Sequence, residues 1–305
     1  MSKRLLSMTH SQIESLSSKE LLKAIALSEG RIMAGECVCS TAPLLNDITN
    51  AEVVASMSAD ILILNIFDVD NPLIQGLPEC REKDTIRKLK ELTGRIIGIN
   101  LEPTENKPGD EALWRMTKGR MASAENARKA KEMGVDILVI TGNPGNSVSN
   151  KAIVSAIREI RNELRDEIIL ITGKMHASGI LEESGEKIVT KEDVEEFIDA
   201  GADIILLPAP GTVPGISESN IHELISYIHE KGKLAMTSIG TSQEGADTDT
   251  IRRIALMAKA AGADIHHIGD SGYVGMALPE NIMAYSIAIR GVRHTYHQMG
   301  QSINR

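Results

Sequence analysis

The segment GVDILVIT at residues 134–141 joins the end of a helix-like stretch to the start of a short apolar run. Related segments occur three more times, as SADI at 58–61 and as GADI at 201–204 and 262–265. A glycine just past a helix end adopts the left-handed conformation that terminates the helix. The β-branched run after it is typical of a buried strand. The four segments therefore predict four helix-to-strand junctions, with each Asp at the amino-terminal end of its strand. Either a fourfold (βα)₂ repeat or ordinary loop chemistry explains them.

Apolar runs of this kind alternate with stretches of helical period along the whole chain. The predicted strands are residues 31–37, 60–66, 95–101, 136–141, 167–172, 203–207, 233–238 and 264–268. The predicted helices are residues 18–28, 49–58, 81–93, 121–133, 149–164, 191–200, 217–231, 248–261 and 279–290. Parallel strands need crossover helices, and eight βα units favour a closed barrel over an open doubly wound sheet. We predict an α/β fold, a (β/α)8 TIM barrel at 31–305, with an N-terminal helical extension at 1–30.

Composition argues against several classes of partner. The chain has 305 residues and a formal net charge of −9, whereas a nucleic-acid surface needs clustered Lys and Arg. Aromatic residues make up 2% of the sequence, so stacking platforms for bases or sugars are disfavoured. The chain has no apolar run as long as a membrane span and no signal-peptide core at its start. We expect a cytoplasmic protein that binds neither nucleic acid nor membranes.

The first candidate catalytic residue is Glu36, near the end of the first predicted strand. It shares the parity of Ile32 and Ala34, which places it on the interior side of that strand. A carboxylate in an apolar strand is costly without a partner. Lys174 is the expected partner, because it faces the barrel mouth if Leu170 faces the interior.

Two further candidates complete the predicted catalytic set. Glu102 follows the third predicted strand, and His176 lies just after the fifth. A desolvated Lys174 suits Schiff-base formation, while carboxylates and a histidine suit proton transfer beside a carbonyl group. We therefore predict Glu36, Lys174, Glu102 and His176 as catalytic residues.

Two Gly-rich loops follow the last two predicted strands, as SIGTS at 238–242 and GDSGYVG at 269–275. In barrel enzymes these loops commonly bind phosphate, because glycine lets backbone N–H groups approach the anion. The carboxylate in the second loop opposes phosphate binding unless a cation intervenes. The predicted substrate-binding residues in these loops are Ser238, Gly240, Thr241, Gly269, Asp270, Ser271 and Gly272.

Other loops after the predicted strands offer backbone and side-chain donors to a hydroxylated substrate. Long polar loops on one end of a rigid scaffold usually carry function. The additional substrate-binding candidates in these loops are Asn143, Pro210 and Gly211. Two more lie at strand ends: Asn100, which shares the parity of Gly98 at the end of the third predicted strand, and Thr141, which ends the fourth.

The sequence FDVD at 67–70 resembles the Asp-x-Asp opening of haloacid-dehalogenase-type phosphatases. This resemblance implies that Asp68 contacts the substrate as a nucleophile, and Thr141, Lys174 and the GDS at 269–271 resemble later motifs of that family. The chain departs from the pattern in two ways. Asn-Pro stands where the family has Gly-Thr, and the acidic motif lacks its second Asp.

Metal binding and assembly stay open at this level. Glu36, Glu102, Asp68 and His176 are a candidate set for Mg²⁺, Mn²⁺ or Zn²⁺, although their spacing does not establish a site. We predict no certain cofactor, with a divalent metal, Mg²⁺ or Mn²⁺, as an option. The expected partner is a small phosphorylated substrate, and a homo-oligomer is a further option.

In architecture over 31–290 and in its two Gly-rich loops, the chain resembles phosphate-binding barrel enzymes such as aldolases and epimerases. The Lys-Lys-Cys-Gly-His signature of isocitrate-lyase-like barrels does not occur. The resemblance implies an enzyme that cleaves C–C bonds in, or isomerises, a small phosphorylated sugar or oxo acid. The alternatives are a hydrolase, either a phosphatase or a phospho-glycoside hydrolase, and a non-catalytic sugar-phosphate-binding barrel.

Overall fold

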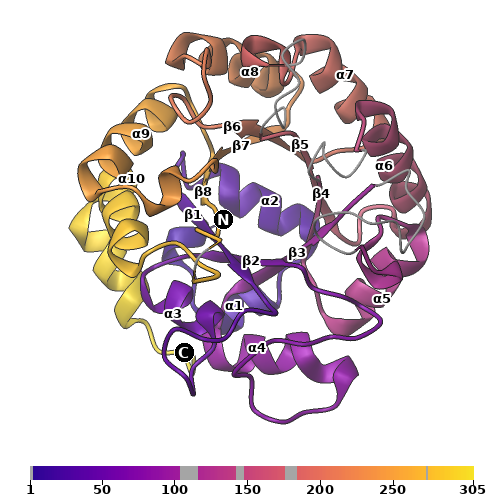
Figure 1. Ribbon diagram of the computed structural model, residues 1–305, viewed down its shortest axis with the longest axis vertical. Coiled ribbons are helices and arrows are strands. Elements are labelled where there is room, and N and C mark those ends of the chain that lie inside the picture. Colours follow the sequence, from indigo (N-terminus) through magenta and orange to yellow (C-terminus); the bar gives the residue numbers. More distant parts are fainter. Residues whose placement is uncertain (1–2, 104–115, 142–147, 176–183, 273) are drawn as a thin grey trace.

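The computed structural model describes residues 3–103, 116–141, 148–175, 184–272 and 274–305. Its centre is a closed barrel of parallel strands in the order β1 to β8, ringed by helices (Figure 1). The strands are Ile32–Val38 (β1), Ile61–Asn65 (β2), Ile96–Leu101 (β3), Ile137–Ile140 (β4), Ile169–Gly173 (β5), Ile204–Pro208 (β6), Leu234–Ile239 (β7) and Ile265–Ile268 (β8). The predicted (β/α)8 fold is confirmed.

The helices of the outer ring follow the predicted segments closely. They are Asn50–Ser56 (α3), Thr85–Thr93 (α4), Ala124–Met133 (α5), Asn150–Leu164 (α6), Lys191–Ala200 (α7), Glu218–Glu230 (α8), Thr248–Ala260 (α9) and Pro279–Gly300 (α10). The last helix runs ten residues beyond the predicted end at 290, across a break at Gly291, whose φ is 74°. No described helix is long and apolar enough to cross a membrane.

Strand alternation divides the apolar side chains into two layers. One set, including Ile61, Ile63 and Ile171, fills the barrel interior. The opposite set, including Leu62 and Leu170, packs under the helices. Because the interior is filled with isoleucine, polar residues of interior parity reach solvent only at the carboxyl ends of the strands.

The four repeated Asp residues lie at the amino-terminal end of the barrel, as predicted. Each carboxylate accepts a hydrogen bond from a backbone N–H of the preceding strand: Asp60 from Met33, Asp136 from Ile97, Asp203 from Leu170 and Asp264 from Ala235, at 2.8 to 3.0 Å. Each also pairs with a basic side chain of an even-numbered helix: Arg290 of α10, Lys90 of α4, Arg161 of α6 and His229 of α8. The repeat thus ties alternate strands and helices together around the whole barrel.

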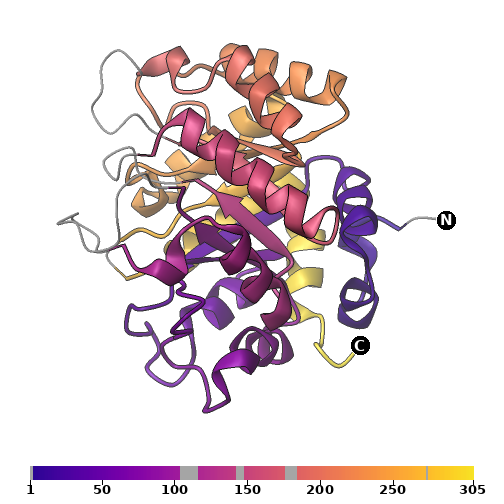
Figure 2. The same ribbon diagram turned by 90° about the vertical axis from the view of Figure 1, so that its right-hand side faces the viewer.

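The N-terminal segment covers this same end of the barrel. Two helices, His10–Glu14 (α1) and Ser18–Ala26 (α2), lie across one end of the molecule (Figure 2). Leu21 and Ile25 are buried in the same apolar cluster as Ile32 and the other interior side chains of the barrel. The opposite end, where the strands finish, remains available for a site.

Candidate active site

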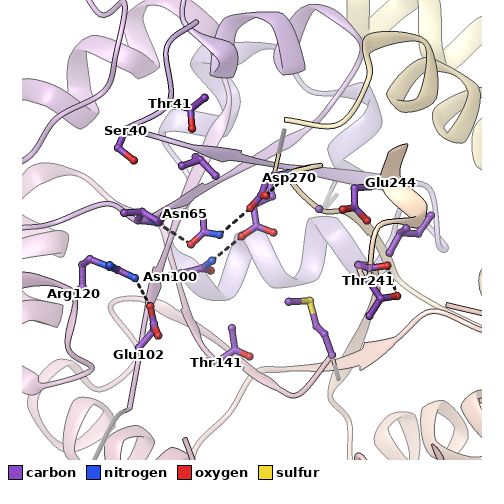
Figure 3. A pocket seen from close by; sticks show the side chains of 18 residues that line it. Ser40, Thr41, Asn65, Asn100, Glu102, Arg120, Thr141, Thr241, Glu244 and Asp270 are labelled. Atoms are coloured by element: carbon purple, nitrogen blue, oxygen red, sulfur yellow. Dashed lines mark hydrogen bonds and ion pairs between the residues drawn. The ribbon is translucent and has the colours of Figure 1, made fainter. Parts of the chain in front are cut away.

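A cavity of about 390 Å³ opens at the carboxyl ends of the strands (Figure 3). Each strand except β6 contributes to the lining, either with its own residues or with residues of the loop that follows it. The lining residues are Glu36, Val38, Ser40, Thr41, Asn65, Ile66, Asn100, Glu102, Arg120, Thr141, Met175, Ile239, Gly240, Thr241, Glu244, Gly269, Asp270 and Gly272. Four of them are carboxylic acids, and Arg120 is the basic residue among the described lining.

Glu36 lies at the floor of this cavity and is buried. Its Oε1 accepts a hydrogen bond of 2.8 Å from Nδ2 of Asn100. Its Oε2 lies 3.3 Å from Nε2 of His267, which makes an ion pair when the ring is protonated. The carboxylate is therefore held in one orientation from two strands, as an acid–base group needs.

His267 is held in turn from the side away from Glu36. Its Nδ1 lies 2.6 Å from Oγ of Ser238, its register partner on β7. Ser238 Oγ also donates to Sδ of Met175 at 2.9 Å, so the histidine Nδ1 is the donor to the serine oxygen in this arrangement. The contact between Nε2 and Glu36 then attracts when either group carries a further proton. The connected side chains of Ser238, His267 and Glu36 can therefore hold a proton beneath the cavity.

Asp270 and Glu244 bring two more carboxylates to the same cavity. Asp270 accepts hydrogen bonds of 2.9 Å from Nδ2 of Asn65 and from the backbone N–H of Gly272. Burial and the charge of Glu36 nevertheless raise the pKa of Asp270. Burial, then Asp270 and Glu36, raise the pKa of Glu244. Carboxyl groups with raised pKa values in a cavity are typical of functional sites.

Glu102 and Arg120 form an ion pair on the other side of the cavity, with Nη2 and Oε1 2.5 Å apart (Figure 3). The pair is supported by the backbone, because the N–H of Glu102 donates to the carbonyl of Arg120 at 2.9 Å. Gly119 permits this arrangement, since a Cβ there would lie 1.8 Å from Oδ1 of Asp68. That oxygen accepts backbone hydrogen bonds from Asp70 and from the residue after it. Asp68 thus shapes the loop that lies against Gly119.

Most of the predicted site residues lie in one place, although their roles stay predictions. The cavity lining includes Glu36, Asn100, Glu102, Thr141, Gly240, Thr241, Gly269, Asp270 and Gly272. Ser238 lies beneath it, in contact with His267. Five other predicted site residues that the structure describes do not line the cavity: Asp68, Lys174, Pro210, Gly211 and Ser271. His176 and Asn143 lie outside the described residues.

Strand β5 does not have the orientation on which the pairing of Lys174 with Glu36 depended. That pairing required Leu170 to face the interior, but Ile169 and Ile171 fill the interior and Leu170 packs under the helices. Lys174 is buried, and the described contacts of Glu36 are those with Asn100 and His267. The run EIILIT is apolar on both faces, so its pattern does not distinguish the inward side.

Sequence reasoning missed several residues of the site, among them Asn65, Arg120, Glu244 and His267. Asn65 and His267 share interior parity with isoleucines of β2 and β8, so strand alternation was an available signal for both. Arg120 and Glu244 lie in loops, where no periodicity exists to place them. Only the fold brings these two side chains to the cavity.

The candidate metal set is not assembled in the described structure. Across the described ranges, no group of three or more His, Cys, Asp or Glu side chains is placed to hold a metal ion. Glu36 and Glu102 share the cavity, whereas Asp68 does not line it and His176 is not described. We derive no step through a metal ion.

Fold and site together define a (β/α)8 barrel with an acidic cavity at the carboxyl ends of its strands. The sequence profile of a family described as "Domain of unknown function (DUF7916)" matches residues 6–305, so the chain belongs to that family. Among curated proteins, no sequence matches at a significant level.

Two solved structures illustrate how widely the fold is shared. A 2,3-dimethylmalate lyase, a member of the PEP mutase/isocitrate lyase superfamily, is 14% identical with a TM-score of 0.51, over 83% of this chain and 81% of that one. The BexX/CysO complex of Amycolatopsis orientalis gives 17% identity and the same TM-score, over 88% of this chain and 91% of the other. Since 1183 chains match, these likenesses establish the barrel and not the chemistry.

Proposed function

We propose that the protein is a lyase or isomerase that acts on a small hydroxy or oxo acid, with Glu36 as its acid–base catalyst. The observation that carries this proposal is the position of Glu36. The carboxylate lines the cavity and is oriented by Asn100 and by the ion-pair contact with His267. A positioned acid–base group contributes about 10²- to 10⁴-fold to a proton-transfer reaction.

Glu36 can serve both reactions through one proton. In isomerisation, it removes the proton from the hydroxyl-bearing carbon beside the carbonyl group, and an enediolate forms. It then returns the proton to the former carbonyl carbon, while the hydroxyl proton passes to the former carbonyl oxygen. In C–C cleavage, it removes the proton of a hydroxyl group, whose O–H electrons form the new C=O bond. The electrons of the broken C–C bond pass to the enolate of the second product, which takes the proton back from Glu36. Arg120, on the cavity wall, is suited to a substrate carboxylate.

An oxo acid fits the cavity better than a phosphorylated sugar. The two loops expected to bind phosphate place Asp270 and Glu244 in the lining, and carboxylates repel a phosphate group. The phosphatase alternative loses support because Asp68 organises a loop and does not line the cavity. The lyase named among the similar structures supports the lyase arm only through its shared fold.

The test uses the full chain and a panel of C3 to C6 hydroxy and oxo acids in D₂O. Proton NMR reports both cleavage and deuterium exchange beside the carbonyl group. We expect at least one acid to react and Glu36→Gln to slow that reaction at least about 100-fold. The matched control is Glu163→Gln, whose carboxylate pairs with Arg128 on the exposed helical surface. The proposal fails if no acid reacts or if Glu36→Gln retains the wild-type rate.

A further inference from the structure

Glu244 and Asp270, which we call the acidic subsite, lie away from the Arg120–Glu102 pair. In Figure 3 the ion pair stands on one side of the cavity, Glu244 and Thr241 on the other, and Asp270 between them. The cavity therefore has an Arg–Glu ion pair on one wall, whereas Glu244 and Asp270 form no ion pair among the described residues.

Glu244 is the unusual member of this subsite. Its side chain is 7% exposed, and its Oε2 has no hydrogen-bond partner in the described part of the chain. An unsatisfied buried carboxylate is costly, so proteins normally pair such groups. The residue lines a cavity large enough for a ligand, so a cationic ligand group can approach its carboxylate.

The backbone around Glu244 is held firmly in place. Nδ2 of Asn281, at the start of α10, donates to the carbonyl groups of Glu244 and Ala246 at 2.9 and 2.8 Å. This clamp fixes the short helix Gln243–Gly245 against the barrel. Glu244 is thus held at the cavity by a neighbouring element, which argues that its buried position is maintained by the fold.

The charges around the acidic subsite favour the binding of a cation. The charges that act on Glu244 in the described structure are Asp270 and Glu36, which raise its pKa, and His267, which lowers it. Glu36 likewise raises the pKa of Asp270, and His267 lowers it. His267 already lies against Glu36 and Ser238, so it does not neutralise the whole cluster.

We propose that the acidic subsite binds an ammonium group of the substrate. An ammonium group carries a positive charge and three donors, so it can donate to more than one carboxylate of the cavity lining. A hydroxyl group supplies one donor and no charge, and a phosphate or a second carboxylate adds repulsion. The placement of the substrate carboxylate at Arg120 rests on the proposed function. Together, the two placements make the substrate a small amino acid whose amine is distant from its carboxylate.

The pH dependence of binding follows from the same contacts. Because burial and neighbouring carboxylates raise the pKa values of Glu244 and Asp270, both groups lose charge at a higher pH than ordinary carboxyl groups do. A bound ammonium group favours their ionised forms. Amine affinity should therefore rise as pH rises above the ordinary carboxyl range, while the amine itself stays charged.

The experiment compares three probes of equal length: 4-aminobutyrate, 4-hydroxybutyrate and succinate. The 6-aminohexanoate, 6-hydroxyhexanoate and adipate series tests a longer span. Binding to the full chain is measured by saturation-transfer NMR and calorimetry. We expect the amino member of at least one series to bind at least about tenfold more tightly than its hydroxy counterpart, and the diacid to bind most weakly.

Variants separate the subsite from the rest of the cavity. Glu244→Gln and Asp270→Asn should each remove the preference for the amine, whereas Glu163→Gln should retain it. The proposal is overturned if no amino probe binds up to tens of millimolar, if hydroxy and amino probes bind equally, or if Glu244→Gln keeps the preference. Amine binding without turnover of any acid would refute the proposed function alone, and turnover without amine preference would refute the subsite alone.

Discussion

At the scale of single residues, the cavity is built at the expense of stability. Glu244 keeps a carboxylate oxygen without a partner, and burial raises its pKa. A carboxyl group whose pKa is higher in the folded than in the unfolded protein binds more protons when folded. Stability then decreases as pH rises from the ordinary glutamate pKa through the raised one. Such strain is expected where a site is arranged for binding rather than for folding.

Glu244→Gln should therefore stabilise the protein, and do so more at neutral than at acidic pH. Loss of one charge from the cluster relieves repulsion from Asp270 and Glu36. We expect a gain of about 1 kcal/mol, or roughly 2 °C in Tm, near pH 7.5. The gain should shrink toward pH 4.5, because the raised pKa leaves more of the wild-type carboxyl group protonated there than in an ordinary glutamate. Calorimetry at both values, with Glu163→Gln as control, checks this, and an unchanged Tm at neutral pH would contradict it.

At the scale of elements, the four Asp–cation junctions differ in burial. The side chains of Arg290 and Asp60 are 0% and 4% exposed, whereas those of Lys90 and Asp136 are 20% and 29% exposed. Removing one partner of a buried pair leaves the other charge buried and uncompensated. In a partly exposed pair, water can solvate the charge that remains. The Asp–cation pairs of the repeat therefore contribute unequally to the free energy of unfolding.

Asp60→Asn should destabilise the protein by about 3–5 kcal/mol, and Asp136→Asn by about 1 kcal/mol or less. The asparagine oxygen in either variant can still accept the strand N–H, so the comparison isolates the loss of charge. Urea unfolding followed by circular dichroism measures both values. Equal losses at the two positions would show that burial of the pair does not govern the difference.

At the scale of the whole molecule, the N-terminal segment belongs energetically to the barrel. Ile25 packs into the cluster that contains the interior side chains of the strands. The core thus crosses the boundary predicted at residue 30. A barrel closed at its amino-terminal end by α2 keeps water from its isoleucine interior.

Ile25→Ala should cost about 2–5 kcal/mol, because it leaves a cavity in this shared core. Leu27→Ala is the matched control from the end of the same helix, since Leu27 is 41% exposed, and it should change stability by less than about 0.5 kcal/mol. Both are measured by urea unfolding with far-ultraviolet circular dichroism and limited proteolysis. One coincident transition is expected, and separate loss of the N-terminal segment would refute the shared core.

Local patterns in the sequence were sufficient for the barrel itself. Alternating apolar runs and helical stretches predicted all eight strands, and the Asp after each junction marked the amino-terminal end. The same alternation placed Glu36 on the interior side, because it shares the parity of Ile32 and Ala34 on its strand. These predictions depend on neighbours within a few residues.

The composition of the cavity depended on the tertiary structure. Lys174 was misplaced because β5 is apolar on both faces, so only its packing selects the inward one. Arg120 and Glu244 come from loops, and Asn281 holds Glu244 from a helix 37 residues away. The sequence by itself thus determined the barrel and the end that carries the site. Closure of the barrel decided which charges meet there, because strand ends distant in the chain converge on one rim.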